Sequence, residues 1–386
     1  MAKLGEVCLI NPKSCTLRDD TEVSFIPMTK VGEHGEFDAS EIKNYSEVKK
    51  GFTNFQNGDI LFAKITPCME NGKGAIAHNM KNGIGFGSTE FHVLRPDTDK
   101  ITSEWLYYLT TWKTFRKEAE RNMTGSAGQK RVPKTFLENY VVNLPDIDTQ
   151  KSENKILRKV DDLIFLRKQQ LAKLDELVKA RFVEKFGSYP ENENAYPVVN
   201  VSDIADAGVG VVIKPAQYYV TEERGIKAFR SLNIGEMYIK DSDWVYFSTE
   251  GNESNKKSQL HENDLLIVRS GAPGTSCVVT KEFEGCNAVD VIIAHPNLSK
   301  VNPWYLCAYI NYPHGKKQIE EGTGGAAQQH FNVGKCNNLK VLLPPLEPQN
   351  QFAAFVERVN QQKQTVQQSL EKLELMKKAL MQEYFG

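Results

Sequence analysis

Two tracts of hydrogen-bond donors, each directly after a run of small residues, are the parts of this sequence best suited to bind a ligand. Gln129-Lys130-Arg131 follows Thr124 to Gly128, and Gln328-Gln329-His330 follows Thr323 to Ala327. Gln, Lys, Arg and His side chains donate to phosphates and base edges, and small residues let backbone approach a surface closely. The pattern favours contact with nucleic acid. A plain helix-to-strand connection with glycines at positive φ also fits it.

Basic residues elsewhere are further candidates for the same chemistry. Lys64 and Arg269 occupy equivalent positions at the ends of predicted strands, where a side chain on a rigid element could reach a groove of a duplex. Several other lysines could hold phosphates, namely Lys73, Lys256, Lys257, Lys316 and Lys317. The formal net charge is only −1, so a polyanion must meet a local basic surface, and these lysines equally suit an ordinary solvated surface.

No motif of catalytic chemistry survives inspection. Gly271–Ser276 lacks both the spacing and the lysine of a phosphate-binding G-x-x-x-x-G-K-[ST] loop. There is no G-x-G-x-x-G, no G-x-S-x-G nucleophile turn and no H-E-x-x-H pair, and no two histidines stand four residues apart. The sequence therefore predicts a chain that is not an enzyme and that binds neither a cofactor nor a metal itself.

Length and composition are those of a folded protein of two or three domains. The chain has 386 residues, of which 40% are hydrophobic and 25% charged. Its seven cysteines are scattered and form no C-x-x-C pair, which favours reduced thiols in a cytosol over a disulfide framework. No export signal or membrane span is visible. We expect a cytoplasmic protein that does not engage a membrane.

The sequence repeats itself. An offset of 199 aligns the tail that ends at Gly386 with the segment that ends at Gly187, and it holds without a gap back to Thr124. Upstream, insertions shift the offset as they do in surface loops, but Asp59–Lys64 still matches Asp264–Arg269. The chain is therefore two copies of one unit, divided near residue 187.

Each copy has two parts of different composition. The first is rich in Gly, Asn and short β-branched or aromatic runs, which predicts strands with a few helices, notably Ser103 to Arg121 and Pro303 to Glu321. The second has no Gly or Pro between Gln150 and Phe186, or between Gln349 and Phe385, which predicts one long helix in each copy. The predicted fold class is α+β, with globular domains at residues 1–149 and 188–348 and long helices at 150–187 and 349–386.

Both predicted long helices carry apolar residues in alternating steps of four and three, the a/d pattern of a coiled coil. The predicted pairing residues are Leu157, Val160, Ile164, Leu171, Leu174, Val178, Phe352, Val356, Val359, Val366, Leu370, Leu373 and Leu380. Arg167, Arg181, Lys363 and Lys377 interrupt the pattern. A helix of roughly 36 residues is about 54 Å long and needs a partner for its apolar stripe.

Pairing of the two helices within one chain is favoured over two alternatives. Each helix could instead pack on its own globular part, or pair with a second chain. The residues leave open whether the helices run parallel or antiparallel.

The order of these signals resembles the specificity subunit of type I restriction-modification enzymes. Leu4-Gly5-Glu6-Val7 is followed by Gly58-Asp59-Ile60-Leu61, by T-G-x-x-x-Q from Thr124, by Leu144-Pro145, and by Gln150 with a long helix. The whole series then recurs, with Gln349 at the place of Gln150. The resemblance covers the entire chain, and the duplication makes it more specific than any single motif.

The resemblance implies two target recognition domains, each of which recognises one half of a split site in double-stranded DNA. It also implies an antiparallel intramolecular coiled coil with pseudo-two-fold symmetry, which sets the spacer between the half-sites. Two modification subunits would dock on the helices, carry S-adenosylmethionine and methylate adenine. Restriction subunits would use ATP and Mg and cut DNA. Because the two donor tracts differ, the predicted site is asymmetric.

Two other classes of protein stay open at this stage. One is an adaptor that binds only proteins, built from two repeated docking modules. The other is a stand-alone DNA enzyme with an unfamiliar active site.

Overall fold

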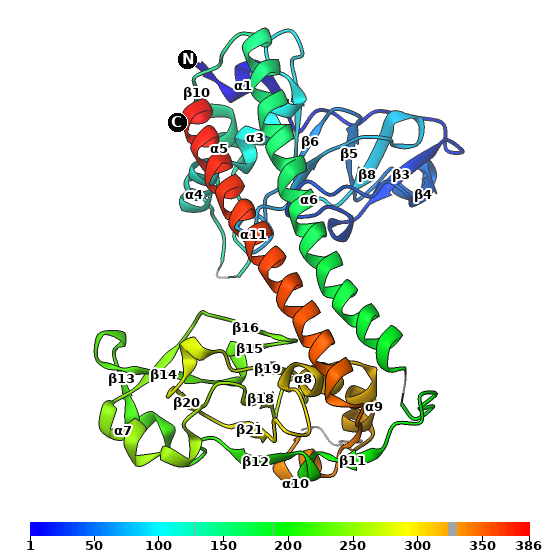
Figure 1. The fold of residues 1–386 in the computed structure, drawn as a ribbon. Coiled ribbons are helices and arrows are strands. Elements are labelled where there is room, and N and C mark those ends of the chain that lie inside the picture. Colours follow the sequence, from blue (N-terminus) through cyan, green and yellow to red (C-terminus); the bar gives the residue numbers. More distant parts are fainter. Residues whose placement is uncertain (127, 188, 323–329) are drawn as a thin grey trace. The chain divides into compact units, whose positions relative to one another are not determined.

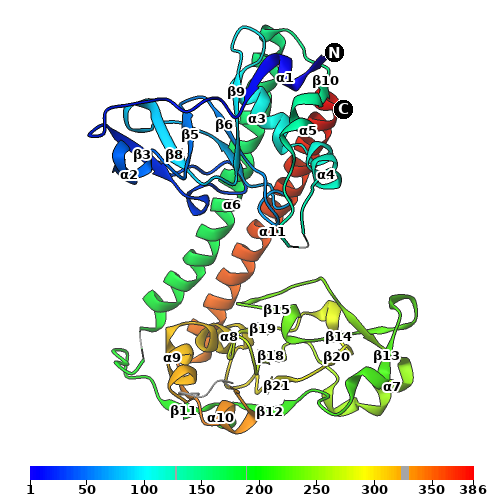
Figure 2. The same ribbon diagram turned by 180° about the vertical axis from the view of Figure 1, so that it is seen from behind.

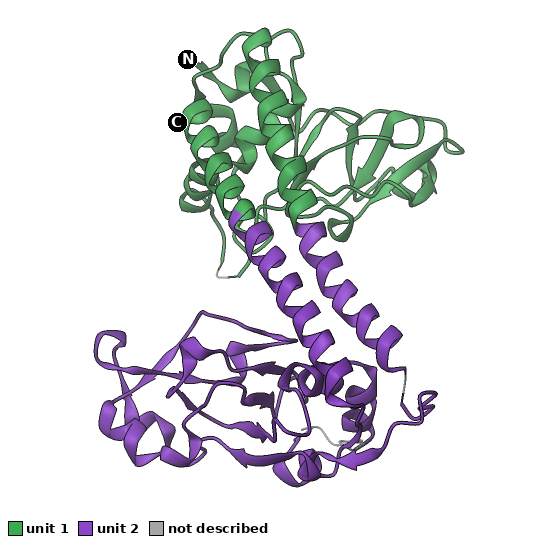
Figure 3. Cartoon of the chain, viewed as in Figure 1, with its two compact units in different colours: residues 1–167, 369–386 green, residues 168–368 purple. Residues whose placement is uncertain are grey.

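The computed structural model describes residues 1–126, 128–187, 189–322 and 330–386. They form two compact units, shown in different colours in Figure 3. Unit 1 comprises residues 1–167 and 369–386, and unit 2 comprises residues 168–368. Each unit therefore contains one body of strands and short helices together with part of each long helix. The sequence repeat divides the chain near residue 187, which is a different division. Unit 1 contains the end of the second long helix, residues 369–386, and unit 2 contains the end of the first long helix, residues 168–187.

Unit 1 contains two four-stranded sheets, ordered β2-β9-β6-β7 and β4-β3-β8-β5, and a two-stranded sheet of β1 and β10 (Figure 1). Its strands are β1 (Ala2–Lys3), β2 (Cys8–Ile10), β3 (Glu22–Ile26), β4 (Ile42–Asn44), β5 (Thr53–Gln56), β6 (Ile60–Ala63), β7 (Gly74–Ile76), β8 (Ile84–Gly87), β9 (Phe91–Pro96) and β10 (Val141–Val142). Its short α-helices are α1 (Leu4–Val7), α2 (Tyr45–Val48), α3 (Ser103–Thr111), α4 (Lys113–Arg121) and α5 (Lys134–Asn139).

Unit 2 repeats this plan with sheets ordered β12-β21-β18-β19 and β13-β17-β14-β20 and the pairs β11-β22 and β15-β16. Its strands are β11 (Val198–Asn200), β12 (Ala205–Val209), β13 (Tyr219–Val220), β14 (Ile226–Phe229), β15 (Ile234–Gly235), β16 (Tyr238–Ile239), β17 (Val245–Phe247), β18 (Leu265–Val268), β19 (Ser276–Val278), β20 (Asn287–Ala288), β21 (Val291–Pro296) and β22 (Lys340–Leu342). Its short α-helices are α7 (Thr249–Ser254), α8 (Pro303–Asn311), α9 (Pro313–Gly322) and α10 (Val333–Asn337).

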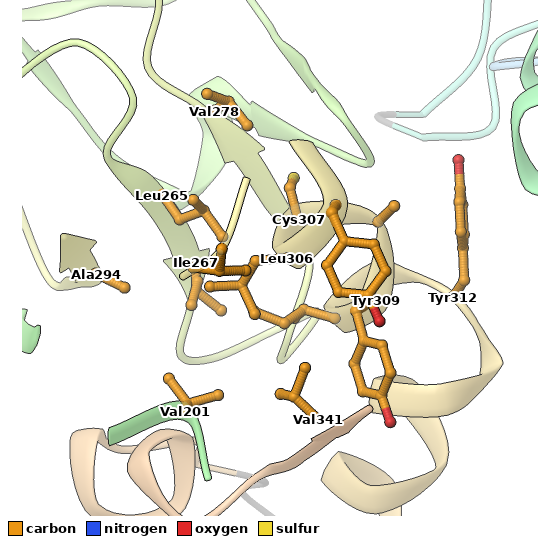
Figure 4. Close-up of a cluster of buried hydrophobic side chains, with 14 of the residues drawn as sticks. Val201, Leu265, Ile267, Val278, Ala294, Leu306, Cys307, Tyr309, Tyr312 and Val341 are labelled. Atoms are coloured by element: carbon orange, nitrogen blue, oxygen red, sulfur yellow. The ribbon is translucent and has the colours of Figure 1, made fainter. Parts of the chain in front are cut away.

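We call β2-β9-β6-β7 and β12-β21-β18-β19 the main sheets, and β6 and β18 their central strands. Each central strand is buried on both faces. In β18, Leu265 and Ile267 belong to a cluster with residues of α8, which Figure 4 shows, while the alternate residues Leu266 and Val268 belong to a second cluster. Side chains alternate between the faces of a strand, so one face meets the helices and the other meets the rest of the unit. β6 is arranged in the same way.

The predicted helix from Ser103 to Arg121 is wrong in one respect, because it is two helices. Trp112 lies between α3 and α4 in an extended conformation (φ −61°, ψ 130°), and its ring packs 6.3 Å from that of Phe385. Unit 2 has the same break at Tyr312, which precedes Pro313 and is therefore disfavoured in a helix. Core packing in one unit and a proline in the other produce the same bend.

The long helices α6 (Ile147–Phe186) and α11 (Leu346–Phe385) lie side by side in each unit and run antiparallel (Figures 1 and 2). In unit 1, Lys377 pairs with Asp161 at 2.6 Å and Arg167 Nε donates to Ser369 Oγ at 3.2 Å. In unit 2, Lys363 pairs with Asp175 and Lys185 Nζ donates to Gln351 Oε1 at 2.8 Å. Residue numbers fall along one helix as they rise along the other, which confirms the antiparallel pairing.

The cations that interrupt the apolar pattern have different positions. Arg167, Lys363 and Lys377 bond to residues of the other helix, so the interface contains ion pairs and hydrogen bonds as well as apolar contacts. Arg181 is exposed and pairs with Glu184 of its own helix, while Phe182 beside it is fully buried. The apolar stripe therefore shifts by one residue at the end of α6.

A phenylalanine at the end of each long helix packs into the core of a unit. In unit 2, the Phe186 ring lies 4.7 Å from Tyr305 and 5.7 Å from Phe352. In unit 1, the Phe385 ring lies 4.8 Å from Trp105. Each body is thus completed by the end of the helix that belongs to the other sequence copy.

A buried glutamine at the start of each long helix joins the helix to the body. Gln150 accepts a hydrogen bond from the Thr102 amide at 2.9 Å and donates to the carbonyls of Lys100 and Pro145. Gln349 makes the same three bonds, to Asn302, Lys300 and Pro344. The glutamines that the repeat aligns are therefore identical structural connections.

Candidate nucleic-acid interface

In unit 1 the fold brings together two candidate sites that are distant in the sequence. Lys64 follows β6, and its carbonyl accepts a hydrogen bond from the amide of Val132 at 2.9 Å. The amide of Thr66 donates to the carbonyl of Lys130 at 3.1 Å. The segment after β6 therefore lies beside the donor tract Gln129-Lys130-Arg131.

Arg131 is held by a carboxylate in this cluster. Its Nε and Nη2 donate to the two oxygens of Glu90 at 2.9 and 2.7 Å, and Nη1 donates to the carbonyl of Gln129 at 3.1 Å. The hydrogen bonds from Arg131 lower the pKa of Glu90, so the pair is ionised at neutral pH. Gln129 and Lys130 are exposed beside this fixed guanidinium.

Unit 2 has a corresponding cluster at the end of β18. Arg269 Nη1 donates to Asp290 Oδ1 at 2.5 Å, and Nη2 donates to His330 Nε2 at 2.6 Å. Because Arg has no acceptor, Nε2 of His330 must accept, and Nδ1 then donates to Ser270 Oγ at 2.9 Å. Gln328 and Gln329 lie outside the described residues.

The two clusters occupy equivalent places. The amide of Phe331 bonds to the carbonyl of Arg269 at 2.9 Å, as that of Val132 bonds to Lys64. Glu90 and Asp290 each directly precede the neighbouring strand, β9 and β21. Sequence reasoning missed both carboxylates, although an acidic residue before the same strand in both copies was a visible signal.

The remaining basic candidates have varied surroundings. Lys73 is half-buried, and its ammonium donates to the carbonyl of Met28 at 3.2 Å. Lys316 pairs with Glu236 at 2.9 Å. Lys256, Lys257 and Lys317 are exposed. The structure thus brings Lys64 together with Gln129, Lys130 and Arg131, and Arg269 together with His330.

The predicted helix-pairing residues all lie on the inner side of the long helices. Leu157, Val160, Val178, Phe352, Val356, Val359, Val366 and Leu370 are buried, and Ile164, Leu171, Leu174, Leu373 and Leu380 are half-buried. The same helices also carry exposed apolar residues, namely Ile156, Leu163, Phe165, Leu166, Leu177, Val183, Leu375 and Met376. Exposed apolar groups on such a scale are typical of surfaces that bind a partner.

The aspartates that the repeat aligns, Asp59 and Asp264, have a structural role. Asp59 is buried, accepts from the amide of Gln56 and binds Arg95 through two bonds of 2.8 Å. In unit 2, Asp264 accepts from the amide of His261 at 2.7 Å and from His295 Nδ1 at 2.6 Å. Each aspartate fixes the turn that leads into the central strand, which in turn positions Lys64 or Arg269 at its far end.

The part of the chain that the structure describes comprises residues 1–126, 128–187, 189–322 and 330–386. No group of three or more His, Cys, Asp or Glu residues in it is arranged to hold a metal ion. No helix in it is both long enough and apolar enough to cross a bilayer.

The duplicated body, the antiparallel helices and the two arginine clusters define a class of protein that carries two copies of one α+β module in a single chain. A family model for the type I restriction modification DNA specificity domain matches residues 1–176 and 182–375, and the chain belongs to this family.

Two relatives from Escherichia coli carry the same kind of name. The chain is 41% identical to the type I restriction enzyme EcoEI specificity subunit, over 92% of this chain and 76% of that subunit. It is 48% identical to the EcoAI specificity subunit over 40% of this chain, and this match spans only 26% of that subunit.

Solved structures share the fold at low identity. One is a chain from a structure of the complex assembly and conformational transition of a type I restriction-modification system, with a TM-score of 0.61, 18% identity, and coverage of 99% of this chain and 96% of that one. Another is the S subunit of a type I system from M. genitalium, with a TM-score of 0.58, 13% identity, and coverage of 100% and 95%. These likenesses support the fold.

Proposed function

We propose that this chain is the DNA-recognition subunit of a type I restriction-modification complex and that each unit recognises one half of a bipartite, asymmetric site. The observation that carries the proposal is the pair of clusters at equivalent places with different donors. Unit 1 presents Gln129 and Lys130 beside Arg131, while unit 2 presents His330 and Ser270 beside Arg269. Both clusters share an arginine held by a carboxylate, but the donors around it differ. This arrangement suits two modules that recognise different DNA sequences.

The chemistry of the clusters matches the two tasks of DNA recognition. Exposed Lys130 suits a phosphate, which fixes register without specifying a base. Arginine and glutamine side chains form paired hydrogen bonds with guanine and adenine in the major groove. Carboxylates that hold the guanidinium groups reduce the conformational freedom that binding would otherwise remove.

Catalysis is assigned in this proposal to other subunits. Two modification subunits would dock on the exposed apolar faces of α6 and α11 and carry S-adenosylmethionine, and restriction subunits would use ATP and Mg. This chain itself would bind no cofactor and would act in the cytoplasm, where it meets the DNA. The length of the long helices would set the spacer, so lengthening both by one heptad should widen it without changing the specified bases.

Methylome sequencing tests the proposal in cells that carry the chain with its modification subunits. We expect methylated adenines in a split, asymmetric motif. Replacing residues 188–348 by those of a homologous chain should alter one half of the motif and leave the other unchanged, which also assigns each half-site to a unit. A continuous palindromic motif would contradict the proposal. An adaptor that binds only proteins would give no salt-sensitive duplex binding even with its partners present.

A further inference from the structure

Arg116 in α4 is a buried cation with an unusual environment. It is 7% exposed, and among the described residues no carboxylate forms an ion pair with it. Its guanidinium lies 4.4 Å above the ring of Phe62. Burial lowers the pKa of Arg116 to about 10, so the group stays charged at neutral pH. A buried charge without a counter-ion is costly and needs hydrogen bonds to hold it.

Backbone carbonyls supply those hydrogen bonds. Arg116 Nε donates to Thr110 at 2.5 Å, Nη1 to Met69 at 2.9 Å and to Lys73 at 3.5 Å, and Nη2 to Gly72 at 3.1 Å. The first acceptor lies at the end of α3, where helix carbonyls lack partners. The other three belong to the segment between β6 and β7, residues 64–73, which we call the β6–β7 loop. Arg116 therefore anchors this loop to the helices.

The outer side of the β6–β7 loop forms part of the candidate nucleic-acid interface. The loop begins at Lys64, and the amide of Thr66 bonds to Lys130 of the donor tract. Pro67, Glu70 and Asn71 are exposed on it. The guanidinium thus holds one side of a loop whose other side meets the residues proposed to contact DNA.

Unit 2 lacks this anchor. α4 begins at Lys113 and α9 at Pro313, so Lys316 stands at the position of Arg116. Lys316 is exposed and pairs with Glu236 instead. The start of β19 is held by a neutral side chain, Asn311, whose amide donates to the carbonyl of Ser276 at 2.8 Å. The buried guanidinium is therefore a feature of the first unit alone among these paired positions.

We propose that Arg116 is a positioning residue for the half-site that unit 1 recognises, and that it acts by fixing the β6–β7 loop against the donor tract. This inference rests on the proposed function. Replacing Arg116 removes the side-chain donor to the carbonyls of Thr110 and Gly72 and with it the link between α3 and the loop, which favours rearrangement of the loop. The carbonyls of Met69 and Lys73 keep hydrogen bonds from the amides of Gly72 and Ala63. Lysine keeps the charge, but as a compact point charge it does not reproduce the planar fork that reaches carbonyls on two elements.

The test compares Arg116→Lys and Arg116→Met in the complete methyltransferase complex by methylome sequencing. We expect discrimination at one or more positions of the unit 1 half-site to fall by roughly tenfold or more, the scale of a mismatched base pair. The unit 2 half-site and the spacer should not change. Hydrogen exchange of the amides of residues 65, 66 and 68–73 should accelerate in the same variants.

Gln150→Ala is the matched control, because it removes three hydrogen bonds from a buried site of unit 1 outside the loop. This variant should lower the free energy of unfolding without reducing base discrimination at either half-site. The inference is overturned if Arg116→Lys keeps full discrimination, if both half-sites relax equally, or if Gln150→Ala relaxes the unit 1 half-site as much. Failure of the wild-type complex to give a split motif would instead refute the proposed function. If Arg116→Met does not assemble, Arg116→Lys decides.

Discussion

Units 1 and 2 differ in the charged side chains near the ends of β6 and β18. In both units an arginine is held by a carboxylate that precedes the neighbouring strand, but the arginine comes from different places. In unit 1 the arginine is Arg131, which belongs to the donor tract. In unit 2 it is Arg269, which directly follows the central strand β18. The ion pair is kept while its source and its neighbours change, which indicates that the frame is structural and the neighbours are free to vary.

The same units agree where body and long helix join. Gln150 and Gln349 make the same three hydrogen bonds, and Phe385 and Phe186 pack on aromatic rings at equivalent positions. Such agreement is expected of contacts that any pair of modules must make with the helices. The comparison therefore separates a shared support from variable recognition surfaces.

The largest expected effect concerns the aromatic ends of the long helices. Phe186→Ala should destabilise unit 2 by about 3–5 kcal/mol, the usual cost of emptying a buried phenylalanine site, because Phe186 is 1% exposed. Phe385→Ala should destabilise unit 1 by less, because its ring is only half-buried. Thermal unfolding combined with limited proteolysis measures both effects. Equal losses of stability in both units from either variant would contradict the assignment of each ring to one core.

Much of the support was predictable from the sequence because it depends on local composition and periodicity. Absence of Gly and Pro predicted both long helices within a few residues of α6 and α11, and the a/d pattern indicated their pairing. The pattern misplaced Arg181, since at that point Phe182 turns toward the core of unit 2 and the period changes. Tertiary packing, which periodicity does not encode, determined that shift.

The clusters were predictable only in part. Donor tracts and strand ends were visible as separate candidates, but their proximity depends on how the segment after β6 folds back on Lys130. Glu90 and Arg116 were missed because carboxylates and arginines are common, and their importance comes from partners distant in the sequence. Arg116 is an anchor because its acceptors are backbone carbonyls, which no side-chain pattern reveals.

A smaller effect is expected from removing the charge that holds each arginine. Glu90→Gln should free Arg131 and reduce discrimination at the unit 1 half-site by roughly tenfold, while Asp290→Asn should do the same only at the unit 2 half-site. Competition binding of the assembled complex to duplexes with single mismatches measures each half separately. Glu104→Gln provides a control, since Glu104 pairs with Arg158 on α6 and lies outside the cluster. If either cluster variant weakened both halves alike, the clusters would not be local determinants.

The smallest expected effect distinguishes the two aspartates that support the central strands. Asp59 binds Arg95, which stays charged at all accessible pH values, whereas Asp264 binds His295, whose pKa is raised by that hydrogen bond. A raised folded-state pKa gives stability that is fully present below the unfolded value of about 6.5 and is lost as pH rises through the folded value. Unit 2 should therefore lose up to about 1 kcal/mol of stability as the pH rises above about 6.5, a limit set by the partial exposure of His295.

His295→Arg sharpens this last difference, because it gives unit 2 the ion pair of unit 1. The measurement is the free energy of unfolding at pH 6 and pH 8.5 for the wild type and the variant. Subtracting the two profiles cancels other titrations in unit 2, including His314, whose pKa is lowered by burial and which therefore acts in the opposite sense. We expect the variant to lose less stability than the wild type across this range. Parallel profiles would show that the Asp264 pair is as insensitive to pH as the Asp59 pair.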